Sequence, residues 1–220
     1  MKIIVFLLLA LSATVLSAGF VHAEQTGASY EKGLQMVREA KYQPAMAEFL
    51  PLAQAGHAPS QFSVGLMYHL GRGVRTDPAV AYDWYKKAVL QEHPSAMNNM
   101  GMMYLNGEYV AQNRAVAFKL FEKASVQHAQ AKDNVGQCYD NGWGVAANAA
   151  QAINYYQQSG DAGYILGYFH AGELFEKGAP DLPKDIDRAV EFYTLAAEKD
   201  LEKAKTRLRE LNRLPDTLKN

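Results

Sequence analysis

The chain has 220 residues, of which 49% are hydrophobic and 20% are charged, and this balance excludes wholesale disorder. The formal net charge is −1, which gives no electrostatic reason to expect nucleic acid or an anionic membrane surface as a partner. The single cysteine, Cys138, excludes an intramolecular disulfide, so helix packing alone must hold the fold together.

Residues 1–23 have the organisation of a signal peptide. Lys2 supplies a short basic region, residues 3–16 form a nearly unbroken apolar or small run, and Val21 and Ala23 stand at positions −3 and −1 of a cleavage site. We therefore expect export to a bacterial periplasm or to the medium, with no stable membrane span after cleavage. The alternative is an uncleaved anchor, for which the apolar run is short, because a span needs ~20 residues.

A shorter pair of amphipathic segments follows over residues 28–57. Gly33 and Ala45 lie 12 residues apart there, whereas the corresponding Gly65 and Ala81 of the next segment lie 16 residues apart. The first pair therefore lacks a four-residue loop that the later segments contain.

A longer pattern then recurs every 35 or 36 residues, with leading glycines at Gly65, Gly101, Gly136 and Gly172. The copies begin VGLMYHLGRGV, MGMMYLNGEYV and VGQCYDNGWGV, and a degenerate fourth copy reads GELFEKG. A second element recurs in register as AYDWYKKA, AFKLFEKA, AINYYQQS and AVEFYTLA. Apolar residues repeat at helical spacing in both elements, so each copy is predicted to form two amphipathic helices joined by a glycine turn.

Small residues in this pattern have a packing role. Helix axes approach to ~8–10 Å only where the contact residues are small, so Gly65 and Ala88 leave room for aromatic rings. Tyr68, Trp84 and Tyr85 are predicted to fill that space as core residues, and the alternative is a cofactor-stacking role.

The combined pattern resembles the Sel1-like repeat family, a relative of the tetratricopeptide repeats. The resemblance implies an all-α fold, an α-solenoid in which stacked antiparallel helix pairs wind into a right-handed superhelix. The units expected from it are a tetratricopeptide-like pair over residues 28–57, Sel1-like repeats over residues 58–93, 94–129 and 130–164, a degenerate repeat over residues 165–200, and a C-terminal capping helix over residues 201–214.

The sequence predicts no catalytic residue, no metal site and no cofactor. His57, His93 and His128 recur at spacings of 36 and 35 residues, so they are too far apart to share a zinc ion. Cys138 is expected to be a buried core residue, and the alternatives are a nucleophile or an intermolecular disulfide. One cysteine-rich branch of the Sel1-like family is associated with β-lactamase activity, but this chain lacks its paired cysteines. A β-lactam- or peptidoglycan-directed hydrolase is therefore the alternative to a non-catalytic protein.

The resemblance to tetratricopeptide repeats also implies which positions of each first helix face a partner-binding groove. They are Phe62, Leu66, His69 and Leu70; Asn98, Met102, Leu105 and Asn106; Asp133, Gln137, Asp140 and Asn141; and Phe169, Glu173, Glu176 and Lys177. This groove would be apolar at its start and acidic at its end, and the acidic end would favour a basic or mixed-charge segment of another protein. The alternative is an ordinary solvated face.

The function expected from these features is that of an exported, non-catalytic scaffold or regulator that binds a partner protein or peptide. Envelope adaptor, host-interaction factor and toxin-immunity protein are the roles that the resemblance implies.

Overall fold

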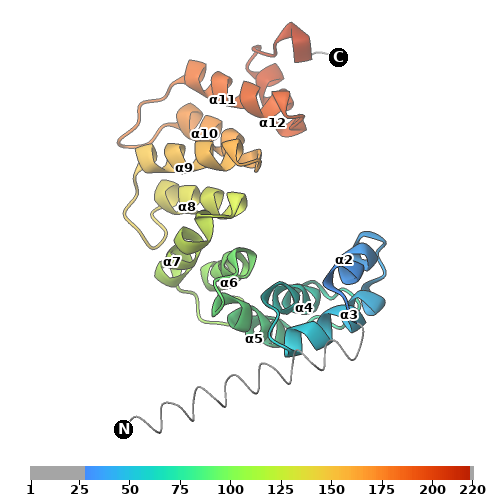
Figure 1. The fold of residues 1–220 in the computed structure, drawn as a ribbon. Helices are drawn as coiled ribbons and strands as arrows, with labels where there is room; N and C mark the ends of the chain where they lie inside the picture. Colours follow the sequence, from blue (N-terminus) through green and yellow to red (C-terminus); the bar gives the residue numbers. More distant parts are fainter. Residues whose placement is uncertain (1–27, 219–220) are drawn as a thin grey trace. The chain divides into compact units, whose positions relative to one another are not determined.

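The computed structural model describes residues 28–218, and this part of the chain is all-α (Figure 1). It contains eleven α-helices, one short 3-10 helix and no named β-strand. The elements are α2 (Tyr30–Arg38), α3 (Tyr42–Gln54), α4 (Ala58–Leu70), α5 (Pro78–Val89), α6 (Pro94–Asn106), α7 (Arg114–Ser125), α8 (Ala129–Asn141), α9 (Ala149–Asp161), α10 (Leu166–Lys177), α11 (Ile186–Glu198), α12 (Glu202–Glu210) and η1 (Asp216–Leu218). The predicted all-α solenoid is confirmed. The predicted signal peptide, residues 1–23, lies outside the described residues.

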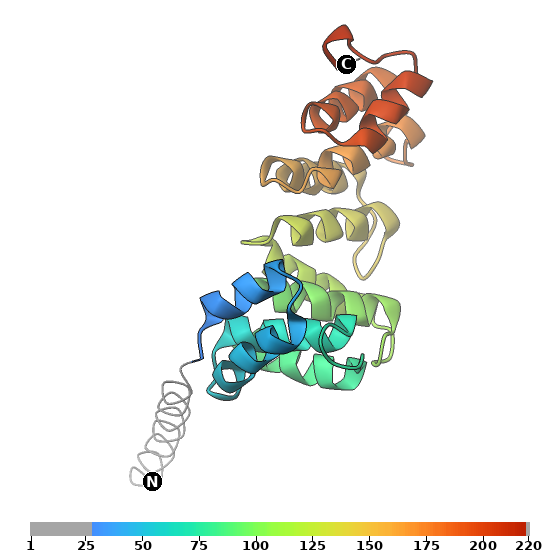
Figure 2. The same ribbon diagram turned by 90° about the vertical axis from the view of Figure 1, so that its right-hand side faces the viewer.

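The chain forms two compact units, which divide between Met100 and Gly101, inside α6. Residues 28–100 belong to the N-terminal unit and residues 101–218 to the C-terminal unit. In the N-terminal unit, α3 packs on α2 and on α4, and α4 packs on α5. In the C-terminal unit, each helix from α7 to α12 packs on the next, and Figure 2 shows α8 to α12 stacked in chain order.

In every helix pair, a glycine of the first helix receives an aromatic ring of the second helix. A Cβ atom on any of these glycines would lie 2.4–2.8 Å from the nearest ring carbon, which is too close for an alanine without rearrangement. The five glycine–ring pairs are Gly33–Phe49, Gly65–Tyr85, Gly101–Phe121, Gly136–Tyr156 and Gly172–Tyr193. These rings are at most 2% exposed, so the glycines have the packing role that the sequence predicts.

Glycine turns connect the α4–α5 pair and the α8–α9 pair each to the helix that precedes it. Gly71 and Gly142 cap α4 and α8 in the left-handed region, with φ of 67° at both positions. Gly144 follows with φ 77°, and a Cβ atom there would lie 2.2 Å from the carbonyl oxygen of Arg114 at the start of α7. The four-residue loop thus rests on the second helix of the preceding repeat. Only glycine allows both this backbone conformation and this close approach.

The fourth repeat makes the same connection differently. Its loop lacks the G-x-G-V turn, and Asp181 instead accepts a hydrogen bond of 3.0 Å from the backbone N–H of Ala149, at the start of α9. A carboxylate at a helix N-terminus satisfies a free donor and complements the helix dipole.

Helix α12 ends the stack of the C-terminal unit. Ala204 and Leu208 are fully buried against the cluster that contains Leu174, and Leu201 and Leu211 pack beside them. The rest of α12 is mainly charged, as expected for a helix that covers the last exposed apolar face.

No helix among residues 28–218 is both long enough and apolar enough to cross a membrane.

Candidate functional site

Two predicted groove residues of the N-terminal unit, Phe62 and His69, contact the buried Tyr85. The Nδ1 atom of His69 lies 3.1 Å from the Tyr85 hydroxyl, and the Asn99 amide donates to the same oxygen at 3.2 Å. Phe62 is half-buried and stacks on Tyr85, with 5.9 Å between ring centroids. Asn98 is only 3% exposed, so it offers little surface to a partner. Leu66 is half-buried and Leu70 is exposed.

The first predicted groove residues of the C-terminal unit are less polar. Met102 and Leu105 are half-buried and pack on the cluster that contains Phe121, whereas Asn106 is exposed. Phe121 has no hydroxyl, and the residue beside it needs no hydrogen-bonding group.

One repeat position explains these contacts. The residue four places after the leading glycine lies beside the ring that the glycine receives: His69 beside Tyr85, Asp140 beside Tyr156, and Glu176 beside Tyr193. Each tyrosine hydroxyl has a polar partner at this position, while Phe121 has Leu105. These groove residues therefore serve the core as well as the surface.

The later groove residues line a cavity of about 960 Å³ in the C-terminal unit. Gln137, Asp140 and Asn141 line it from α8, and Phe169, Glu173, Glu176 and Lys177 line it from α10. The structure therefore brings together seven residues that the groove hypothesis placed in two successive repeats. It also adds residues that the hypothesis did not include, namely Tyr156, His170, Lys184, Tyr193, Lys203, Thr206, Arg207 and Glu210.

Helix α12 is the main contribution that the sequence did not predict. Lys203, Thr206, Arg207 and Glu210 all come from this helix, which was expected only to cap the solenoid. Their spacing of three or four residues places them on one face of α12. That face was present in the sequence as a charged stripe, but a charged stripe on a terminal helix is also typical of a solvated cap.

Two acidic groups of the cavity, Asp140 and Glu176, are neutralised within the chain. Asp140 accepts from the Lys177 ammonium at 2.7 Å, and Glu176 accepts from the Arg207 Nε at 2.9 Å and from the Tyr193 hydroxyl at 2.7 Å. The hydrogen bonds from Arg207 are the main reason that the pKa of Glu176 is lowered. The cavity therefore contains ion pairs rather than a free acidic surface.

Two tyrosines at the back of the cavity are held protonated. Burial, with the negative charge of Asp140 nearby, raises the pKa of Tyr156. Burial and the hydrogen bond to Glu176 raise the pKa of Tyr193. Both hydroxyls therefore act as hydrogen-bond donors at neutral pH and are not candidate bases.

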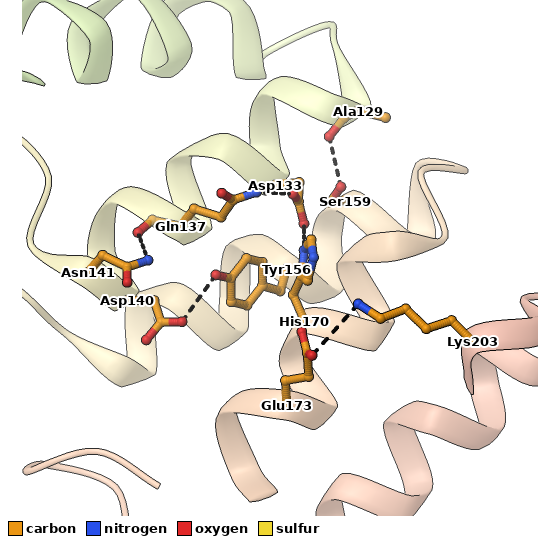
Figure 3. Close-up of polar contacts among 10 residues, drawn as sticks. All are labelled: Ala129, Asp133, Gln137, Asp140, Asn141, Tyr156, Ser159, His170, Glu173 and Lys203. Atoms are coloured by element: carbon orange, nitrogen blue, oxygen red, sulfur yellow. Dashed lines mark hydrogen bonds and ion pairs between the residues drawn. The ribbon is translucent and has the colours of Figure 1, made fainter. Parts of the chain in front are cut away.

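Asp133 does not line the cavity; it is 1% exposed and lies beside His170 and Gln137 (Figure 3). Its carboxylate is 2.8 Å from the Nδ1 atom of His170 and accepts from the Gln137 amide at 2.8 Å. The sequence placed Asp133 on the groove surface, whereas the structure places it beneath His170, which does line the cavity. Its direct role is to fix the orientation of the His170 ring between α8 and α10.

The remaining candidates for chemistry are structural. Cys138 is fully buried, and burial raises the pKa of its thiol to about 12, so it is protonated and inert at neutral pH. The Nδ1 atoms of His93 and His128 accept from backbone N–H groups at the starts of α6 and α8, at 3.3 Å and 3.2 Å. Within residues 28–218, no group of three or more His, Cys, Asp or Glu side chains could hold a metal ion.

Comparisons with known proteins agree with this architecture. A family model described as the Sel1 repeat matches residues 58–93, 94–125, 129–164 and 165–201. A solved Sel1 repeat protein from Oxalobacter formigenes is 31% identical, with a TM-score of 0.75 over 82% of this chain and 74% of that chain.

Two further solved structures have the same fold. One is a protective antigen present in uropathogenic Escherichia coli strains and described as displaying an SLR fold. It is 25% identical, with a TM-score of 0.73 over 89% of this chain and 43% of that chain, so this chain spans less than half of that protein. A Pseudomonas aeruginosa protein is 18% identical, with a TM-score of 0.54 over 79% of this chain and 68% of that chain.

Proposed function

Because the chain belongs to the Sel1 repeat family, we propose that it is an exported, non-catalytic protein whose C-terminal cavity holds a segment of a partner polypeptide. Sel1 repeat proteins bind other proteins and are in general non-catalytic scaffolds. The cavity of about 960 Å³ is the observation that carries the proposal, because it joins the first helices of successive pairs, α8 and α10, with α12.

The lining of the cavity supports binding rather than catalysis. A nucleophile needs a base within hydrogen-bond reach, but the Thr206 hydroxyl on the lining makes no hydrogen bond with any residue from 28 to 218. Purified protein is therefore expected not to hydrolyse nitrocefin. Hydrolysis that survives repurification would instead support the β-lactam-directed alternative.

Export is proposed from the composition of residues 1–23, with cleavage after Ala23. The E. coli relative is described as a protective antigen, which supports a location outside the cytoplasm for this chain as well. Mass spectrometry of the protein from cell envelopes and medium should find an N-terminus at Glu24. An intact N-terminus on cytoplasmic protein would contradict this part of the proposal.

Affinity capture from envelope extracts tests the binding function. The blocked variant is Asn141→Arg with Thr206→Arg, because both residues are exposed on the cavity lining. The control is Gln127→Arg with Gln151→Arg, which adds the same charges at exposed positions outside the lining.

The expected result is a protein that wild type and control retain and that the blocked variant loses. Equal retention by all three proteins would contradict the cavity as the binding site. The identity of the captured protein then distinguishes an envelope adaptor, a host-interaction factor and a toxin-immunity protein.

A further inference from the structure

The anionic side chains that line the cavity are nearly all engaged by the chain itself. Asp140 is held by Lys177 and by the Tyr156 hydroxyl, Glu176 by Arg207 and the Tyr193 hydroxyl, and Glu210 by Arg207. A basic group of a partner would have to compete with these internal donors for the same carboxylates. Glu173 alone has only a long ion pair, 3.8 Å from the Lys203 ammonium.

The cationic side chains are less engaged. Lys184 makes no ion pair with any described residue, although its charge contributes to the lowered pKa of Glu176. Lys203 is 59% exposed, and its ammonium lies 4.0 Å from the centroid of the Phe169 ring. A long ion pair and an exposed cation–π contact each contribute little, so Lys203 can turn toward a ligand at small cost.

His170 adds a third available group. Its Nδ1 atom is held by Asp133, and its Nε2 atom makes no hydrogen bond with a described residue. No buried side-chain nitrogen or oxygen in residues 28–218 lacks a partner, so Nε2 must be accessible to solvent. The His170 ring lies beside Phe169, 6.3 Å between centroids, so it shares that ring with Lys203.

From this difference in engagement we infer that the cavity binds an acidic segment of a partner polypeptide, through carboxylates that pair with Lys184 and Lys203. The inference rests on the proposed function and specifies the partner's chemistry. It replaces the expectation of a basic or mixed-charge partner, which treated every acidic residue of the groove as available. His170 supplies a donor for the same carboxylates when its Nε2 carries a proton.

The test compares three short fluorescent peptides of one design, acetylated and amidated so that their ends carry no charge. They have glutamate, glutamine or lysine at the same positions, and their binding to the purified full chain is measured by fluorescence anisotropy. The glutamate peptide should bind about fivefold or more tightly than the glutamine peptide, and added salt should reduce this difference. Tighter binding of the lysine peptide, or no preference for glutamate, would overturn the inference.

Variants of the full chain localise the effect. Lys184→Gln with Lys203→Gln should remove the preference for glutamate, and Glu173→Gln should increase it, because a competing carboxylate is lost. The control, Lys119→Gln with Lys123→Gln, removes the same charge from exposed positions on α7 and should leave the preference unchanged. If the control pair alone removes it, the acidic segment binds elsewhere and the inference fails.

Failure of the inference can be distinguished from failure of the proposed function. If wild type captures a partner that the blocked variant loses, while the purified chain binds the lysine peptide most tightly, the proposed function stands and the acidic segment is rejected.

Discussion

Four residues after its leading glycine, α4 of the N-terminal unit carries His69, whereas α8 and α10 of the C-terminal unit carry Asp140 and Glu176. All three hydrogen-bond the hydroxyl of a buried tyrosine. In the N-terminal unit the surroundings are aromatic, with Phe62 stacked on the tyrosine. In the C-terminal unit they are ion pairs that line a cavity.

This comparison distinguishes the packing within each helix pair, called the frame here, from the surface of its first helix. The frame depends on the glycine–ring contact, which is the same in both units. The surface depends on a few positions of each first helix, which can change while the packing stays the same. Four experiments can break or sharpen this comparison.

The largest effect is expected for Asp133→Ala in the C-terminal unit. The change leaves His170 and Gln137 without their buried acceptor, so the free energy of unfolding should fall by about 3 kcal/mol. Phe62 occupies the same repeat position in the N-terminal unit and is half-buried, so Phe62→Ala should cost less, about 1–2 kcal/mol. Urea denaturation measures both. A smaller loss for Asp133→Ala than for Phe62→Ala would contradict the structural role of this carboxylate.

Equal effects in the two units are expected for Gly65→Ala and Gly136→Ala. A Cβ atom would lie 2.8 Å from the Tyr85 ring in the first and 2.6 Å from the Tyr156 ring in the second. Overpacking should outweigh the better helix propensity of alanine and leave a net loss of about 1–2 kcal/mol in each variant. Chemical denaturation checks this, and adding Tyr156→Leu to Gly136→Ala should recover part of the loss. A neutral or stabilising glycine variant would show that the ring contact is not needed.

A smaller effect is expected for Phe121→Tyr, which gives the second Sel1 repeat a hydroxyl beside Leu105. That hydroxyl lacks the polar partner that the other tyrosines have, so stability should fall by about 1 kcal/mol. Leu105→Glu in the same protein should restore it, as Glu176 does for Tyr193. Thermal unfolding of the single and double variants measures the coupling. No rescue would mean that the residue pairing at this position is incidental.

The stability of both units is expected to depend on pH in the same way. Burial lowers the pKa of His57 in the N-terminal unit and of His128 in the C-terminal unit. Above their ordinary pKa of about 6.5 both folded and unfolded states are neutral. As the pH falls below this value, the unfolded state takes up protons before the folded state does. The free energy of unfolding therefore decreases until the pH reaches the lowered pKa values of the folded state.

Asparagine is a favoured N-cap residue, so it can replace the cap that His128 makes at α8, and it removes the titration at both positions. The double variant should therefore lose less stability than wild type between neutral pH and mildly acidic pH, as measured by urea denaturation. If its loss equals that of wild type, other groups cause the pH dependence.

The fold could be predicted because the repeat fixes local structure and packing together. Gly136 and Tyr156 recur in register with their counterparts, so one pattern predicted the helices, the turns and the core. The cavity could be predicted only in part. Asp140 and Glu176 follow from repeat position, but their availability depends on Lys177 and Arg207, which belong to other helices. No spacing rule indicates that α12 would contribute Arg207, because a terminal helix has no repeat to compare with.

Photo-crosslinking from inside the cavity tests the central claim most directly. A photoreactive amino acid at Thr206, which is exposed on the lining, is compared with one at Lys119 on the outer helix α7. Irradiation of cells that express each variant should give a crosslinked partner polypeptide from position 206 and none from position 119. Crosslinking from position 119 alone, or equally from both, would contradict a partner site in the cavity.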